Sequence, residues 1–211
     1  MRHIKTVALN ILVILVVFVS SAQAAVGGQK EPAYTVIKKE GEFEVREYEP
    51  YIMASVEVSS DFNGALYSGF MKLFNYISGK NTNRSKIKMT APVTEEHVSV
   101  SEKIPMTAPV TSEKAGGSYI VSFIMPKGYT IDTLPVPDDK SITFRQVPAH
   151  KAAVIRFSGR MNEGLADKKI AELKAWLAKN GMEPRSGFLM AQYDPPWIPG
   201  FMRRNEIIVE V

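Results

Sequence analysis

The chain has 211 residues, of which 26 are Lys or Arg and 22 are Asp or Glu, so its formal net charge is only +4. A charge this small gives no electrostatic reason to expect nucleic acid as a partner. The chain contains no cysteine, which excludes a disulfide framework, a thiol nucleophile and a cysteine-linked lipid.

The first segment has the three parts of a secretory signal. A basic start is followed by an almost wholly apolar stretch at residues 7–19 and by small residues around Gln23. This predicts a signal peptide over residues 1–24, a periplasmic or secreted protein, and no membrane span after cleavage. The alternative is a retained anchor helix, for which the stretch is short because a bilayer needs ~20 apolar residues. The remaining residues 25–211 are enough for one domain with its own core.

The next residues predict three strands and a helix. Strands are expected at residues 34–39, 43–48 and 51–58, the first two paired around Gly41, because apolar and β-branched residues alternate there. Ser60 or Asp61 then offers a helix N-cap, and apolar residues recur at spacings of three and four until Gly79. The apolar stripe comprises Phe62, Leu66, Phe70, Leu73, Phe74 and Ile77.

A second amphipathic helix is predicted between Asn162, which can cap it, and Gly181, which can end it. Its expected buried stripe is Ala166, Ile170, Leu173, Trp176 and Leu177. Both helices need a sheet against which to bury these faces.

The two helices lie in similar surroundings, which indicates an internal duplication. Each follows a strand, a proline-marked turn and another strand, at residues 45–58 and 144–157. Later strands are expected at residues 94–100, 119–125, 187–193 and 206–211. The duplication predicts an α+β fold, a twisted antiparallel sheet or open barrel with two flanking helices and two pseudo-symmetric halves. A cleft is expected where the halves meet.

A shorter repeat, Met-Thr-Ala-Pro-Val, occurs at residues 89–93 and again at residues 106–110. Proline ends or bends strands, so the two copies are expected as matched segments at a sheet edge.

Several motifs together resemble the SOUL heme-binding family, in the family's order and over nearly the whole chain after the signal. They are FEVREY at residues 43–48, NYISGKN at 75–81, KMTAPV at 88–93, YDPP at 193–196 and RRNE at 203–206. The resemblance implies the two-half fold and binding of heme or a related tetrapyrrole as a ligand, against the first helix and the loop after the Pro-Pro pair. The matching positions are Tyr67, Phe70, Met71, Phe74, Trp197, Ile198, Met202 and Arg203.

One departure from the family concerns the heme iron. Glu47 stands where animal members thought to ligate iron have a histidine, so an axial imidazole is not expected from this position. Of the remaining candidates, His97 and His150 are interpreted as surface residues rather than iron ligands. Met89 and Met106 are interpreted as flexible core residues. No metal site is predicted.

The loop after the Pro-Pro pair leaves two roles open for its arginines. Arg203 and Arg204 could pair with ligand carboxylates, or they could cap the loop against Asp194 or Glu206. Trp197 in this proline-rich loop is costly to leave in water, so it is expected to cover either the core edge or a ligand.

No catalytic motif is evident: the sequence lacks a Gly-x-Ser-x-Gly elbow, a phosphate-binding glycine loop and a His-Glu-x-x-His helix. The sequence therefore predicts a binding protein and not an enzyme. Two alternatives stay open: a binding module for other amphipathic small molecules, resembling bacterial effector-binding domains, and an enzyme that uses a cleft carboxylate such as Glu47.

Overall fold

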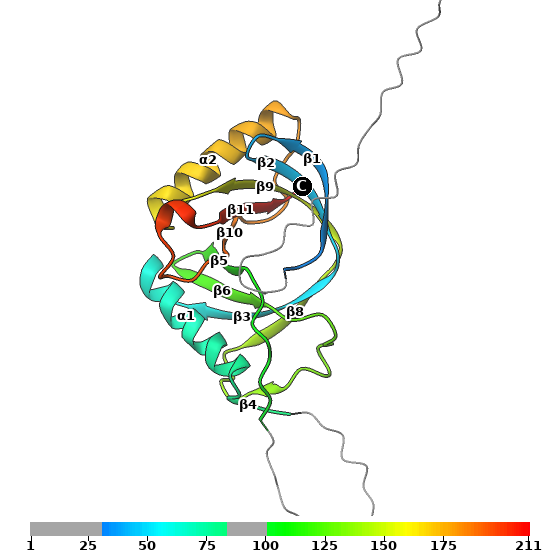
Figure 1. Ribbon diagram of the computed structural model, residues 1–211, viewed down its shortest axis with the longest axis vertical. Helices are drawn as coiled ribbons and strands as arrows, with labels where there is room; N and C mark the ends of the chain where they lie inside the picture. Colours follow the sequence, from blue (N-terminus) through cyan, green and yellow to red (C-terminus); the bar gives the residue numbers. More distant parts are fainter. Residues whose placement is uncertain (1–30, 84–100) are drawn as a thin grey trace, which may run out of the picture.

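The computed structural model describes residues 31–83 and 101–211, which form a strongly curled antiparallel sheet with two helices on its outer side (Figure 1). The strands of the main sheet are β1 Tyr34–Glu40, β2 Phe43–Tyr48, β3 Tyr51–Val58, β5 Val110–Ala115, β6 Ser118–Ile124, β8 Thr143–Val147, β9 His150–Phe157, β10 Leu189–Gln192 and β11 Asn205–Glu210. The other elements are the helices α1 Phe62–Ile77 and α2 Glu163–Lys179, the 3-10 helix η1 Gly200–Met202, and the paired short strands β4 Asn81–Thr82 and β7 Val136–Pro137. The predicted α+β class is confirmed. The predicted signal peptide and the strand expected at residues 94–100 lie outside the described residues.

The two halves of the sheet are related, but the strand that precedes each proline-marked turn pairs with the other half. The strand order is β1-β2-β9-β11-β10-β5-β6-β3-β8. Counted outward from the junction of β10 and β5, the second half runs β10, β11, β9 and the first runs β5, β6, β3. The next strand outward is β2 on β9 and β8 on β3, so the strands flanking each proline-marked turn cross from one half to the other. The strand that matches β10 in the first half is β5.

Helix α1 begins at the N-cap Asp61, whose carboxylate accepts a hydrogen bond from the Gly64 N–H at 2.7 Å. It packs against β3 and β6, and its approach to β6 is so close that a Cβ on Gly69 would lie 2.6 Å from Val121. The buried face is Phe62, Ala65, Gly69, Leu73, Tyr76 and Ile77. Phe74 was predicted in the buried stripe and is instead exposed, because close packing at glycine and alanine rotates the inward face away from it.

Helix α2 begins at Asn162, whose side chain accepts a hydrogen bond from the Leu165 N–H at 2.9 Å. Its predicted stripe is confirmed: Ala166, Leu173, Trp176 and Leu177 are buried, and Ile170 packs against the same cluster. Trp176 stacks on Phe43 of β2 with the ring planes 2° apart. This core also includes Phe62 and Ala65 of α1, so the N-terminal ends of both helices meet over one cluster. None of the helices within residues 31–83 and 101–211 is long and apolar enough to span a bilayer.

The second Met-Thr-Ala-Pro-Val copy does not lie at a sheet edge, contrary to expectation. It leads into β5, which pairs with β6 on one side and β10 on the other, near the middle of the sheet. Proline is tolerated because Pro109 immediately precedes the strand and removes no ladder hydrogen bond from it. The first copy lies outside the described residues.

Candidate functional site

The α1 residues singled out by the sequence form one partly exposed face. Tyr67 is 71% exposed, and Phe74, two helical turns further on, is also exposed. Phe70 lies between them, stacked on Phe74 with ring centroids 5.8 Å apart and edge-on to Phe123 of β6 at 5.4 Å. Met71 is half-buried. Phe70 therefore belongs partly to the core and supports Phe74, whereas Tyr67 and Phe74 are open to a partner.

The 195–203 loop exposes large apolar side chains, and its backbone is held by hydrogen bonds. Trp197 is 78% exposed and Met202 is also exposed, whereas Ile198 is half-buried. Arg203 holds the loop from inside, because its Nε donates to the Ile198 carbonyl at 2.7 Å and its Nη2 donates to the Pro196 carbonyl. The apolar side chains are exposed on an ordered loop.

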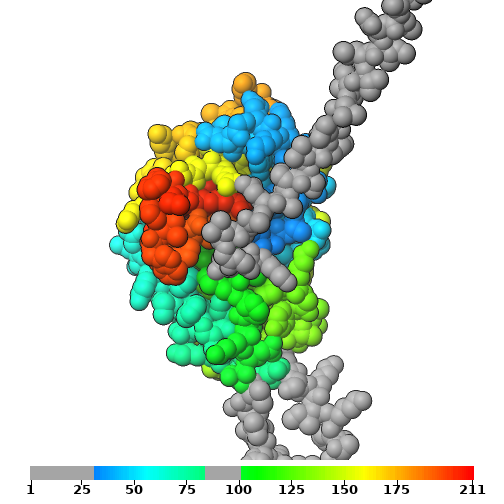
Figure 2. Space-filling model, in the orientation of Figure 1, coloured from blue at the N-terminus to red at the C-terminus, as the bar shows by residue number. Residues whose placement is uncertain are grey.

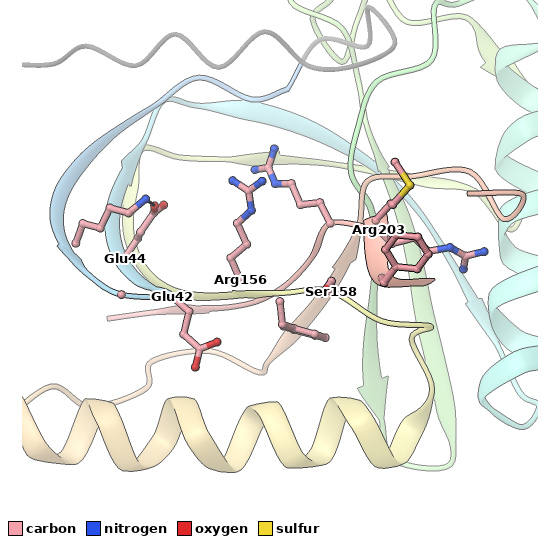
Figure 3. A pocket seen from close by; sticks show the side chains of 11 residues that line it. Glu42, Glu44, Arg156, Ser158 and Arg203 are labelled. Carbon is pink, nitrogen blue, oxygen red and sulfur yellow. Dashed lines mark hydrogen bonds and ion pairs between the residues drawn. The ribbon is translucent and has the colours of Figure 1, made fainter. Parts of the chain in front are cut away.

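The structure brings this loop beside α1. The Gly159 N–H donates to the Gly200 carbonyl at 2.9 Å, which fixes the loop to the chain entering α2. In the segment that leads into α2, Met161 packs in the same hydrophobic cluster as Phe62, which lies at the start of α1. Figures 1 and 3, seen from different directions, both place the loop next to α1. The two groups of predicted residues therefore lie on neighbouring elements.

The two arginines after the loop mostly act as caps in this structure. Arg204 makes ion pairs with Glu206 at 2.9 Å and Glu31 at 2.7 Å, and its N–H donates to Asp194 at 2.6 Å. It also lies over the Tyr193 ring at 3.7 Å. Arg203 uses only its Nε and Nη2 groups in the loop. Its Nη1 group makes no hydrogen bond to the described residues, so it can still donate to a ligand carboxylate.

A pocket of about 370 Å³ opens behind the loop (Figure 3). Its lining comprises Lys39, Gly41, Glu42, Glu44, Arg156, Phe157, Ser158, Phe201, Met202, Arg203 and Arg204. Glu44 and Arg156 rise from the same side of the strands, whereas Glu42 points toward α2, where Lys169 lies 3.6 Å from its carboxylate. The pocket lies where β2 of the first sequence half pairs with β9 of the second, and residues of both halves line it.

The inner, concave face of the sheet carries a buried charged cluster that the sequence analysis missed. Arg46 donates to both oxygens of Glu206, at 2.8 and 2.9 Å, and to Glu44 at 2.8 Å. Glu206 also accepts from Tyr193 at 2.6 Å and from Arg204 at 3.0 Å. The available signal was the alternation of Glu44, Arg46 and Tyr48 along one strand, which places three polar side chains on one face.

The cluster fixes the charges of its members. Burial alone would raise the pKa of Glu206, but hydrogen bonds and charge from Arg46, with Arg204 nearby, hold that pKa below its usual value. The same balance, with Lys39 and Arg46 as partners, lowers the pKa of Glu44. Burial and the charge of Glu206 raise the pKa of Tyr193 well above its ordinary value. The cluster is therefore ionised and internally paired at neutral pH, and it offers no unpaired charge for chemistry.

The candidate iron ligands do not reach the α1 face. His150 is half-buried on the concave face, stacked on Tyr48 with centroids 5.3 Å apart, whereas α1 covers the opposite face. Glu47 lies on β2 in the other half of the sheet. Met106 packs against the core beneath α1 as expected, and His97 and Met89 lie outside the described residues. Within residues 31–83 and 101–211, no cluster of His, Asp and Glu is suited to a metal ion.

Comparison with solved structures identifies the architecture. A hydrolase from Listeria innocua superposes with a TM-score of 0.52 at 12% identity, over 82% of this chain and 93% of that one. The C-terminal domain of EcmrR gives 0.51 at 14% identity, over 84% and 96%. At these identities the likeness shows a shared fold alone.

Sequence relatives include human heme-binding protein 2, which is 52% identical over 56 residues, and heme-binding protein 1 of Xenopus laevis, which is 28% identical over 167 residues. The human match spans 26% of this chain and 27% of that protein, and the Xenopus match spans 78% and 81%. The family model described as SOUL heme-binding protein matches residues 29–210, nearly all of the described fold. The chain belongs to the SOUL heme-binding protein family.

Proposed function

We propose that this protein binds heme or a related tetrapyrrole reversibly, on the face formed by α1 and the 195–203 loop. The observation that carries the proposal is the exposure of Tyr67 and Trp197 on two adjacent, ordered elements of a protein from a heme-binding family. Large aromatic side chains held in water are costly unless a partner covers them. A flat, mostly apolar macrocycle is such a partner.

The contacts would be chiefly apolar. Tyr67, Phe74, Trp197, Ile198 and Met202 would lie against the ring, with Phe70 and Met71 supporting them from below. Burying ~200 Å² of apolar surface at about 25 cal/mol per Å² contributes about 5 kcal/mol without any bond to iron. The spare Nη1 group of Arg203 would donate to a ligand carboxylate, because a guanidinium matches carboxylate geometry.

An axial histidine is not part of this proposal. Glu47 and His150 both lie away from α1, on β2 and on the concave face. Binding should then depend on the macrocycle more than on the metal, so that iron-free protoporphyrin and hemin bind with comparable affinity. Bound heme would supply an iron centre, but nothing in the described site acts on it.

The test is titration of the purified protein with hemin and with iron-free protoporphyrin, followed by ligand absorbance and tryptophan fluorescence. We expect saturable one-to-one binding of both. Tyr67→Ala and Trp197→Ala should each lower affinity about tenfold, the effect of losing one buried aromatic contact. Ile37→Ala is the matched control, because Ile37 is an exposed apolar residue on β1, remote from α1.

Two outcomes would contradict the proposal. Binding of hemin alone would mean that an iron ligand dominates. Unchanged affinity in both aromatic variants, with Ile37→Ala also unchanged, would place the ligand elsewhere on the molecule.

We further propose that the protein acts as an exported carrier and not as an enzyme. The charge pattern and apolar stretch of residues 1–24 support export. Among residues 31–83 and 101–211, the two buried carboxylates, Glu44 and Glu206, are both paired with Arg46, which argues against their use in catalysis. Fractionation of the producing cells with sequencing of the protein's N-terminus tests the first statement; an intact N-terminus in the cytoplasm would refute it. Conversion of bound tetrapyrrole, abolished by Glu47→Gln, would refute the second.

The same titration should include an aromatic cation as a competitor, which tests binding of a different class of ligand. The concave face carries four neighbouring rings, Tyr34, Tyr48, His150 and Tyr51, with successive centroids 5.2 to 5.9 Å apart. Such a row favours flat amphipathic molecules. If an aromatic cation binds and displaces neither hemin nor protoporphyrin, the concave face is a separate site; if it displaces both, the protein is a broader binding module.

A further inference from the structure

Residues 157–162 and the 195–203 loop together form a lobe on one side of the molecule, between α2 and α1 (Figure 1). The Arg160 stem lies against the loop, since a Cβ on Gly200 would be 3.1 Å from its Cγ. From this lobe project Trp197, Met202 and Phe201, the last 80% exposed. Figure 2 shows the end of the chain as a lobe in red and orange beside the teal surface of α1. Phe201 and Met202 also border the pocket behind the loop, whereas Trp197 is not part of its lining.

The backbone of the loop is largely satisfied by the loop itself. Residues 195, 196 and 199 are prolines and have no N–H to satisfy. The Ile198 N–H donates to the Pro195 carbonyl at 3.1 Å and the Met202 N–H to the Pro199 carbonyl at 3.0 Å. Arg203 satisfies two further carbonyls from below. A loop of this kind can leave water without stranding many backbone polar groups, which is the condition for entering lipid.

The charge around the lobe has one sign. Residues 157–162 and 195–203 contain two arginines, Arg160 and Arg203, and no acidic residue. The Arg160 side chain is exposed and makes no ion pair with the described residues. The nearest acids along the chain are occupied: Glu163 pairs with Lys114 at 2.7 Å, and Asp194 accepts the Arg204 N–H. Cationic side chains behind an apolar tip match an anionic lipid surface.

We propose that this lobe docks the protein onto a phospholipid bilayer, with Trp197, Phe201 and Met202 in the interface and Arg160 at the headgroup phosphates. Tryptophan suits this position because its indole combines an apolar body with one N–H donor. A fluid bilayer accepts a projecting apolar tip without a shaped groove. The proposal does not depend on tetrapyrrole binding.

The chain carries its own probe for this interaction. It has two tryptophans, of which Trp176 is buried against Phe43 and Trp197 is exposed. Vesicles of neutral phospholipid, and of neutral with anionic phospholipid, should shift the emission of Trp197 to shorter wavelength. Brominated acyl chains should quench it. Trp197→Phe should remove both responses, which identifies the signal.

Three variants separate the parts of the proposal. Each keeps residues 1–30 of the wild type, so a difference in vesicle binding comes from the substituted residue. Phe201→Ser should weaken vesicle binding about tenfold, because one aromatic side chain leaves the interface. Arg160→Gln should weaken binding to anionic vesicles and leave neutral ones unchanged. Phe74→Ala, on α1 away from the lobe, should lower tetrapyrrole affinity and leave vesicle binding unchanged, so either proposal can fail alone.

Absence of quenching by brominated lipid would overturn the membrane proposal, and so would quenching that Phe201→Ser leaves unchanged. Light scattering addresses the competing occupant, a second copy of the chain. Dimers that Phe201→Ser dissociates, without any response of Trp197 to vesicles, would assign the lobe to self-association and overturn lipid docking.

Discussion

Arg46 on β2 and Glu206 on β11 meet across β9 in two parallel hydrogen bonds of 2.8 and 2.9 Å. The concave side of β9 between them carries the small residues Ala152 and Val154, which leave room for the long side chains to reach each other. Both charges are buried. The pair therefore joins three strands of the α2-covered half through side chains as well as through the backbone.

Removing one charge of this pair should destabilise the fold strongly. Arg46→Met should lower the free energy of unfolding by about 3–5 kcal/mol, because Glu206 is left buried without its main partner. Adding Glu206→Met should recover part of the loss, since paired apolar residues carry no charge to solvate. Denaturant unfolding of the two variants measures both effects.

The matched control for that change is Lys127→Met. Lys127 pairs with Glu49 at 2.7 Å, but both side chains are mostly exposed, so the loss should stay below about 1 kcal/mol. If Arg46→Met and Lys127→Met lowered the free energy of unfolding equally, burial would not make the Arg46 pair more stabilising than an exposed pair.

The same cluster should make stability depend on pH on the acid side. The pKa values of Glu206 and Glu44 in the folded protein lie below the ordinary value of 4.5. A carboxylate whose pKa is lower in the folded than in the unfolded protein contributes its full stabilisation at pH values above the unfolded-state pKa. That stabilisation is lost as the pH falls through the folded-state pKa. Urea unfolding should give a steady free energy from pH 7 to about pH 5 and a decline below about pH 4.5.

Arg46→Met tests the origin of this decline. Without Arg46, Glu206 should be protonated more easily, so the stability gap between variant and wild type should narrow as pH falls. A gap that stays constant down to the acid transition would assign the decline to other carboxylates.

Gly69 should be intolerant of a side chain although it lies within a helix. Alanine in a helix interior is usually favoured over glycine by about 1 kcal/mol. At Gly69 a Cβ would lie 2.6 Å from Val121, so Gly69→Ala should instead cost about 1–3 kcal/mol through overpacking. Gly164→Ala in the first turn of α2 is the control, because the nearest atom to the added Cβ would be Asn162 Oδ1, at an ordinary contact distance of 3.6 Å. Thermal unfolding should show opposite signs for the two; a stabilised Gly69→Ala would refute the close approach of α1 to β6.

Arg203 should control the rigidity of the 195–203 loop. Arg203→Lys keeps the charge but cannot donate to the Ile198 and Pro196 carbonyls in the forked geometry of a guanidinium. The fluorescence anisotropy of the exposed Trp197 should therefore fall, while the unfolding midpoint changes little. Arg160→Lys, outside the loop, should leave the anisotropy unchanged. An unchanged value in Arg203→Lys would mean that the prolines alone hold the loop.

Local features of the chain predicted local structure well. Asp61 and Asn162 were identified as N-caps, and the structure confirms Asn162 and selects Asp61 over Ser60. The pairing of β1 with β2 around Gly41 also followed from the sequence, because a short hairpin leaves few alternatives. The predicted buried stripe of α2 was also correct, because the spacing of apolar residues over a few helical turns defines the buried face.

The candidate site was predictable only in its parts. The apolar residues of α1 and the proline-rich loop were recognisable by their types, but their proximity arises from packing among Phe62, Met161 and Gly200, which are far apart in the chain. The rotation that exposes Phe74 also escaped prediction, because a hydrophobic stripe does not reveal that Gly69 permits the closest approach.

The sequence by itself determined the class of fold, the two-half arrangement and the family. The tertiary structure alone decided that β2 and β8, which precede the two proline-marked turns, are exchanged between the halves and that β5 lies inside the sheet. It also decided that Arg46 and Glu206 are paired, although 160 residues separate them. Periodicity and capping act over a few residues, whereas strand order and buried ion pairs depend on contacts between distant segments, which exist only once the sheet has curled.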